Sequence, residues 1–150
     1  MSIKIHDKIL KESMVLGINI HLFSDEVLGK IRTKIRSRFA KKHTTTNRWL
    51  WEHLDDDKTY NVQNPEAWQW IDEFIEGDEI FMFFDEYESN ALIKFDNVHD
   101  LVKILGETSH FEFYLTNQQT TYLLCFNHHD FLIGAGTAKI WLEKRTQSPK

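Results

Sequence analysis

The chain has 150 residues, 41% of them hydrophobic and 13% aromatic, and a formal net charge of −5 at pH 7. This length, with only two prolines and six glycines, predicts one domain over residues 1–150 and argues against a disordered or linker-rich chain. The start of the chain lacks the apolar core of a signal peptide, and no apolar run approaches the roughly 20 residues of a membrane span. We therefore expect a cytoplasmic protein.

The first half of the chain predicts helices. A helix is expected at residues 3–15, with Gly17 in its C-terminal cap, and a short extended segment follows it. Ser24 is a favourable N-cap for a second helix at 25–42, which carries one apolar stripe and many basic residues. Asn64 and Pro65 predict the start of a third helix, which Gly77 would end.

The second half predicts strands. Apolar runs or alternation indicate strands at 80–84, 91–95, 111–115, 121–126 and 131–133, and helical spacing indicates helices at 98–105 and 138–144. The turns at 117–120 and 127–130 are short and therefore require antiparallel neighbours. We expect an α+β fold: N-terminal helices, then a four- to five-stranded, mainly antiparallel sheet with helices packed on one face.

Cys125 is the only cysteine, so an intrachain disulfide is excluded and a reducing compartment is the simplest expectation. It lies within the apolar run 122–126, which is typical of a buried strand. An inert core thiol is therefore favoured over a nucleophile, because reactive thiols need partial exposure and a positive neighbour.

The charge of the chain is unevenly distributed. Residues 49–90 hold thirteen acidic residues and one basic residue, a local net charge of −12, whereas residues 1–48 have a net charge of +7. A surface of one sign attracts and steers a partner of the opposite sign. The acidic block also contains four tryptophans, and aromatic anchors with a charged surround are typical of protein interfaces.

From this block we predict a set of partner-binding residues. Trp70 lies on the edge of its helix and is the tryptophan expected to be exposed as an anchor. Most acidic residues of the set belong to the 55–57 loop or to the segments on either side of the strand at 80–84. The predicted partner-binding residues are Asp55, Asp56, Asp57, Trp70, Glu76, Asp78, Glu79, Asp85, Glu86 and Glu88.

Two other hypotheses about the function stay open. His128 and His129 could form a small hydrolase-type site in which Asp130 orients an imidazole, although Asn127 and Asp130 also suit an ordinary hairpin turn. The basic helix segment 30–42 could contact phosphates in an adaptor or nucleic-acid-binding module. The spacing of the eight histidines matches no zinc motif, so neither a metal nor a cofactor is predicted and no catalytic residue is assigned.

The motifs Trp49-Leu50-Trp51-Glu52, Phe111-Glu112-Phe113-Tyr114 and Leu123-Leu124-Cys125-x-Asn127-His128-His129-Asp130-x-Leu132-Ile133-Gly134 are similar to those of a family of small uncharacterised bacterial proteins. This resemblance covers roughly residues 25–142. By size, charge and fold class the chain also looks like the immunity proteins of contact-dependent inhibition and other polymorphic toxin systems. The expectation is a protein, not an enzyme, that binds and neutralises a toxin through its acidic surface, and the kind of toxin expected is a nuclease.

Overall fold

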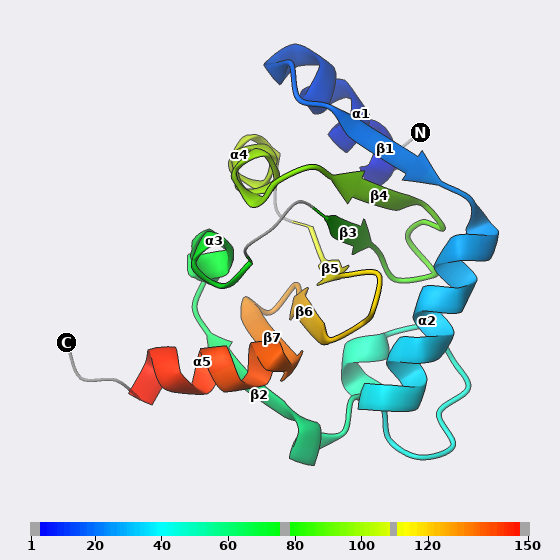
Figure 1. Cartoon of the computed structure of the whole chain (residues 1–150), viewed down its shortest axis with the longest axis vertical. Helices are drawn as coiled ribbons and strands as arrows, with labels where there is room; N and C mark the ends of the chain where they lie inside the picture. The colour runs from blue at the N-terminus through cyan, green and yellow to red at the C-terminus, as the bar shows by residue number, and fades with distance from the viewer. Residues whose placement is uncertain (1–3, 76–78, 109–110, 148–150) are drawn as a thin grey trace.

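A computed structural model describes residues 4–75, 79–108 and 111–147. Seven strands form one sheet in the order β1-β4-β3-β5-β6-β7-β2, and every neighbouring pair is antiparallel (Figure 1). The strands are β1 Ile20–Phe23, β2 Thr59–Gln63, β3 Ile80–Phe83, β4 Leu92–Phe95, β5 Phe113–Thr116, β6 Tyr122–Phe126 and β7 Phe131–Gly136.

Helices cover both faces of this sheet. The α-helices are α1 Ile5–Leu16, α2 Asp25–Phe39, α3 Ile71–Phe74, α4 Val98–Glu107 and α5 Thr137–Gln147, and the 3₁₀ helices are η1 Leu50–His53, η2 Asp56–Lys58 and η3 Ala67–Trp70. One core joins the sheet to α1, η3, α3, α4 and α5, and a second core joins its other face to α2 and η1. The prediction that the helices pack on one face is therefore wrong (Figure 1).

The α+β class is confirmed, but the sheet is larger than predicted. The five predicted strands correspond to β3 to β7, which form the centre of the sheet. The two edge strands come from the first half of the chain: β1 corresponds to the short extended segment predicted after the first helix, and β2 lies where no strand was predicted. Edge strands are commonly short and polar, and β2 reads Thr-Tyr-Asn-Val-Gln. The alternation of apolar and polar residues in β2 is weak and lies within an acidic segment, so the sequence did not indicate a strand there.

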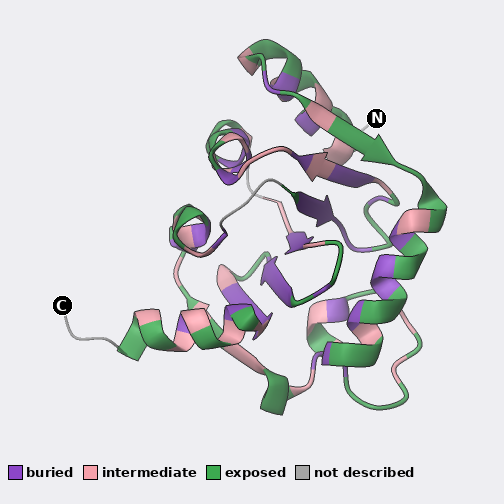
Figure 2. Ribbon diagram, viewed as in Figure 1, coloured by how far each residue is buried: buried purple, intermediate pink, exposed green. Residues whose placement is uncertain are grey.

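Burial follows this layering. The central strands β3, β5 and β6 are buried along their whole length, whereas β1 is mostly exposed (Figure 2). A strand with helices on both faces must be apolar on both faces, which explains the continuous run from Ile80 to Phe84. Cys125 is fully buried, as predicted.

Local helix signals were confirmed where they depend on neighbouring residues alone. Gly17 closes α1 in the left-handed conformation at φ 70°, and the Ser24 hydroxyl accepts the Val27 amide at 3.4 Å. The helix α2 ends at Phe39, three residues before the predicted end, because Ala40 turns extended and pairs with Leu54.

The third predicted helix is interrupted. The residues after Pro65 form the 3₁₀ turn η3 and a single turn of α-helix, α3, and Ile75 is already extended. Gly77, the predicted helix end, lies outside the described residues. Among the residues that the structure describes, no helix is long and apolar enough to cross a membrane.

Gly136 provides a test of the close approach between the end of β7 and Thr121, which directly precedes β6. It adopts φ +65°, and a Cβ at this position would overlap the Thr121 carbonyl oxygen. We expect Gly136→Ala to destabilise the protein by about 2–4 kcal/mol, because left-handed strain and overlap act together. The free energy of unfolding in urea measures this change.

Gly29 is the matched control for that substitution. It lies in α2, is exposed, and has no heavy atom within 4 Å of an added Cβ. Gly29→Ala should stabilise the protein by about 0.5–1 kcal/mol, because alanine has the higher helix propensity. Equal effects of the two substitutions would contradict the packing of Gly136 against Thr121.

Candidate functional site

The strand register divides the predicted acidic residues between two ends of the sheet. Phe83, Tyr114, Cys125 and Ile133 lie in one row across β3, β5, β6 and β7. On one side of this row lie Asp85, Glu112 and the turn containing His128, which we call the His128 end. On the other side lie Glu79 and the 55–58 segment before β2, which we call the Glu79 end.

The distances between these groups are large. Glu79 and Asp85 flank β3, so six residues at about 3.3 Å each place them roughly 20 Å apart. Asp56 and Asp57 share the Glu79 end but precede β2, which is four strand positions from β3, or about 19 Å. The acidic block of the sequence is therefore not one acidic surface in the fold.

The individual positions differ in exposure as well. Asp56, Asp57, Glu79, Glu86 and Glu88 are exposed. Asp55 is half-buried, and its carboxylate caps η2 by accepting the Asp57 amide at 3.0 Å. Glu76 and Asp78 lie outside the described residues.

Trp70 is not the exposed anchor that the sequence predicted. It is half-buried against the core, and the guanidinium of Arg145 lies 3.8 Å from its ring centroid. Arg145 is held there by a bidentate pair with Glu73 at 2.9 and 3.1 Å. The exposed tryptophan is instead Trp49, with 41% of its surface accessible.

Asp85 was predicted to be a surface carboxylate, but it is only 1% exposed. Its carboxylate accepts the backbone amides of Trp49 and Tyr87, the latter at 2.9 Å. A buried carboxylate needs such donors, because an unpaired charge is costly inside a protein. Asp85 is therefore occupied in holding the chain and does not belong to an exposed acidic surface.

The backbone that Asp85 holds is strained. Trp49 adopts φ 51° and ψ 45°, the left-handed conformation, which is uncommon for a residue other than glycine. Such conformations persist only where surrounding structure stabilises them, and they cluster at functional sites. Here the hydrogen bond to Asp85 fixes the conformation, and the indole is displayed at the surface.

Arg32 holds the loop that follows β3. It is 5% exposed and donates to the carbonyls of Phe84 and Ser89 at 2.7 and 3.4 Å and to Asn90 Oδ1 at 2.9 Å. Burial lowers the pKa of Arg32, and the negative charges of Glu86 and Asp85 oppose that shift. The guanidinium thus ties α2 to the loop that carries Tyr87.

These contacts present an aromatic pair at the surface. Tyr87 is 68% exposed and stacks on Trp49, with ring centroids 6.3 Å apart. The guanidinium of Arg48 lies 5.8 Å from the Tyr87 ring centroid. His128 lies against the other side of this group, with its ring 6.3 Å from that of Trp49.

His128 is positioned by a second carboxylate that the sequence did not single out. The Glu112 side chain is 9% exposed, and its oxygens accept Trp51 Nε1 at 3.0 Å, His128 N at 3.1 Å and His128 Nδ1 at 2.9 Å. An ionised carboxylate can only accept, so Nδ1 must carry the proton. Glu112, not Asp130, therefore orients this imidazole.

Asn127 and Asp130 serve the turn itself. Asn127 is buried, and its Oδ1 accepts the amides of His129 and Phe131 at 2.9 and 3.1 Å. Asp130 adopts φ 65°, the left-handed position of the turn. The prediction of a hairpin turn at 127–130 is therefore confirmed.

The surroundings of His128 are aromatic. The rings of His128 and His129 are 4.0 Å apart, and Trp51 lies edge-on to both. Within the described residues, no group of three or more His, Cys, Asp or Glu side chains could hold a metal ion. The two exposed imidazoles therefore extend the aromatic surface of Trp49 and Tyr87.

Beneath this surface lie Tyr114 and Cys125, which do not titrate near neutral pH. Burial raises the pKa of both the Tyr114 hydroxyl and the Cys125 thiol. The Tyr114 hydroxyl accepts the Trp51 amide at 3.1 Å. Together these groups support η1 from below, and the expectation of an inert thiol agrees with this burial.

The basic end of α2 forms a separate feature. Arg36, Lys41, Lys42 and Lys58 line an open pocket of about 500 Å³, and Asp55 lines it with them. Arg36 and Lys58 donate to backbone carbonyls at 2.8 and 3.0 Å. Two of these basic side chains, Arg36 and Lys58, are therefore hydrogen-bonded within the protein.

Sequence reasoning missed Arg32, Glu112, Trp49 and Tyr87 as organising residues. Arg32 gave a usable signal, because it lies four residues after Leu28 on the apolar stripe of α2, where an arginine must find partners. Glu112 and Tyr87 gave none, since their roles depend on residues more than fifteen positions away.

Comparison with protein families finds a match over residues 4–145 to a family described as a family of unknown function, DUF6756. No curated protein and no solved structure matches the chain.

The role of Asp85 can be tested by stability. Asp85→Ala should cost about 2–4 kcal/mol, because it leaves two amides without their acceptor and releases Trp49 from its held conformation. Glu86→Ala is the control and should change the free energy of unfolding by less than about 0.5 kcal/mol, since Glu86 is exposed. A small effect of Asp85→Ala would contradict the structural role given to this carboxylate.

The tautomer of His128 provides a second test. Two-bond ¹H–¹⁵N spectra at a pH where the imidazoles are neutral should show the Nδ1-protonated form for His128, because Nδ1 faces Glu112. His21 is an internal control, since its Nε2 faces Asp96 at 3.1 Å and the Nε2-protonated form is expected. Glu112→Ala, which removes the acceptor, should remove the His128 preference and leave His21 unchanged.

Proposed function

This chain belongs to DUF6756, a family of unknown function, and we propose that it is a cytoplasmic immunity protein that binds and neutralises a protein toxin. The toxin is expected to have a basic cleft, as nucleases do. In this proposal the chain acts by binding, not by catalysis. It contacts the toxin through the surface at the His128 end of the sheet.

The observation that carries this proposal is the display of Trp49 beside Tyr87. Both rings are exposed, they stack on each other, and a buried carboxylate holds the backbone of both. Exposed tryptophan, tyrosine and arginine are the side chains that dominate binding energy at protein interfaces. Because the pair is fixed before binding, little conformational entropy is lost when a partner covers it.

The negative charge of this surface indicates the kind of partner that it binds. Glu86 and Glu88 are exposed on either side of Tyr87. We call Trp49, Glu86, Tyr87, Glu88 and His128 the Trp49 patch. Its carboxylates would pair with the cations that a nuclease uses to bind phosphates, and steering by opposite charge would speed association.

The geometry gives less support to the two alternative functions, a hydrolase and a nucleic-acid-binding module. For a hydrolase centred on His128, His129 and Asp130, the side-chain hydrogen bond and ring contacts of His128 among the described residues are with Glu112, Trp49, Trp51 and His129, and none of these is a nucleophile. For a nucleic-acid module, the basic end of α2 is shared with Asp55. A shift of labelled RNA or DNA at low salt would favour that module over a toxin partner.

The partner can be identified with this protein as bait in its native host. We expect a single toxin fragment to be retained in a one-to-one complex at moderate salt, encoded by a gene next to the one for this chain. Purified toxin domain then allows titration calorimetry and a toxin activity assay with the variants below.

Trp49→Ala should weaken binding by at least about 2 kcal/mol, because it removes the central aromatic anchor. The double charge reversal Glu86→Lys/Glu88→Lys should raise Kd by about tenfold or more, mainly through slower association. Rising salt should weaken the wild-type complex, because exposed charges are screened.

The matched control is Asp56→Lys/Asp57→Lys, which makes the same change in net charge at the Glu79 end. It should leave Kd within about twofold at moderate salt, since it lies more than a Debye length from the Trp49 patch. If this control weakens binding as much as the reversal at Glu86 and Glu88, the interface lies elsewhere or binding depends on net charge alone.

A further inference from the structure

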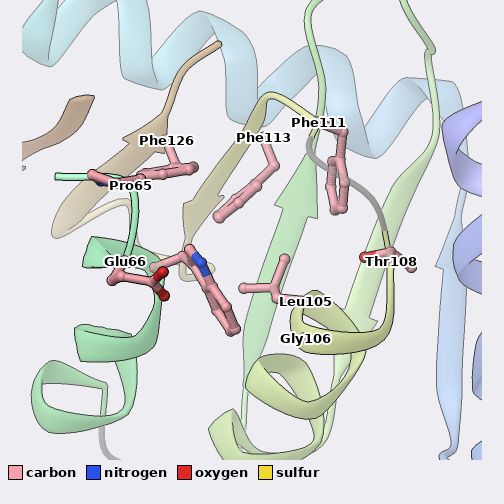
Figure 3. A pocket seen from close by; sticks show the side chains of 9 residues that line it. Pro65, Glu66, Leu105, Gly106, Thr108, Phe111, Phe113 and Phe126 are labelled. Carbon is pink, nitrogen blue, oxygen red and sulfur yellow. The ribbon is translucent and has the colours of Figure 1, made fainter. Parts of the chain in front are cut away.

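A recess lined by several aromatic side chains at the His128 end opens on the opposite face of the sheet from η1. It is an open pocket of about 380 Å³ between η3 and the end of α4, above β5 and β6 (Figure 3). This volume is within the range of small-molecule sites. The lining residues used below are Glu66, Trp68, Gly106, Phe111, Phe113 and Phe126.

Aromatic rings form most of the apolar wall. Phe111, Phe113 and Phe126 form a continuous row, with centroids 5.5 and 6.0 Å apart in successive pairs. Figure 3 shows these three rings along one side of the pocket, with Glu66 and Thr108 at opposite sides of its opening. Trp68 lines the pocket as well. The faces of such rings carry partial negative charge and attract cations.

The charge around the pocket is negative. Among the described residues that line it, Glu66 is the only one with a formal charge. The pocket also lies at the C-terminal end of α4, where the helix dipole is negative. Aromatic faces, a carboxylate and a helix C-terminus all favour a positively charged ligand.

We propose that this pocket binds a small organic cation, an ammonium group carried on a short apolar body. The apolar part would contact the phenyl rings, and the ammonium would lie near Glu66 and the end of α4. The site is separate from the Trp49 patch, although an adjoining recess lined by Pro65, Phe111, Phe126 and His128 connects the two.

The first test compares two probes of nearly the same shape, choline and 3,3-dimethylbutan-1-ol, which differ in charge. Binding to the full chain is followed by amide chemical shifts, with Gly106 and Thr108 as reporters inside the pocket. Choline should bind at least about tenfold more tightly than the neutral alcohol, because cation–π attraction and charge favour it. Equal affinities, or choline shifts that map away from the pocket, would overturn the proposal.

Variants then separate charge from shape. Glu66→Gln should weaken choline binding by about two- to fivefold, as expected for an exposed carboxylate, and leave the alcohol unchanged. Phe111→Leu should weaken choline by about fivefold and the alcohol by less than twofold, because an aliphatic side chain keeps the apolar contact but removes the ring. Glu86→Gln, outside the pocket, is the control for charge.

A blocking variant tests the location. A Cβ on Gly106 would meet Trp68 at 3.5 Å, so a longer side chain there projects into the pocket. Gly106→Leu should abolish binding of both probes, whereas Gly106→Ala should fold at least as well as the wild type and retain choline. Choline binding that persists in Gly106→Leu, once an amide spectrum confirms folding, would refute this location. These measurements need no protein partner, so their result is independent of the toxin proposal.

Discussion

The buried carboxylate of Asp85 is the constraint on which the candidate surface depends. It accepts the amide of Trp49, at the start of η1 and 36 residues away in the chain, and the amide of Tyr87 in its own loop after β3. Arg32 fixes the same loop from α2. Each of these groups would be costly to bury alone, and each finds its partners only when all three segments are in place. Stability and the display of Trp49 are therefore linked.

Glu112 repeats this arrangement at the neighbouring strand. It is nearly buried at the start of β5 and collects donors from Trp51 and His128. Asp85 and Glu112 thus hold the backbone from inside the protein. The acidic and aromatic side chains of the Trp49 patch lie at the surface of the same end of the sheet. An interface built in this way is rigid before it meets a partner, and rigidity reduces the entropic cost of binding.

The proposed toxin-binding patch and the proposed cation pocket lie at the same end of the sheet but over opposite faces. This follows from strand alternation, because successive residues of β5 and β6 point to opposite sides. Tyr114 and Cys125 support η1, whereas Phe113 and Phe126 line the pocket. One pair of strands therefore builds both features, and a change in its register would alter both.

The sequence by itself determined the local elements. Gly17 and Ser24 mark helix ends through contacts within a few residues, and the runs 80–84 and 121–126 indicate buried strands by composition alone. The turn at 127–130 was also predictable, because the Asn127 side chain bonds to the backbone of its own turn and Asp130 is a residue type that tolerates the left-handed conformation. These features need no knowledge of distant residues, so the α+β class and the five central strands could be predicted.

The tertiary structure decided everything that depends on pairing between distant segments. Strand pairing placed β2, and with it Asp56 and Asp57, four strand positions from β3, which divided an acidic block that is continuous in the sequence. The same pairing buried Asp85, covered Trp70 with Arg145 and exposed Trp49 instead. It also brought Glu112 to His128 and placed α2 on the face opposite the other α-helices. Burial and charge pairing are set by neighbours in space, and a single sequence does not specify which distant residues those neighbours are.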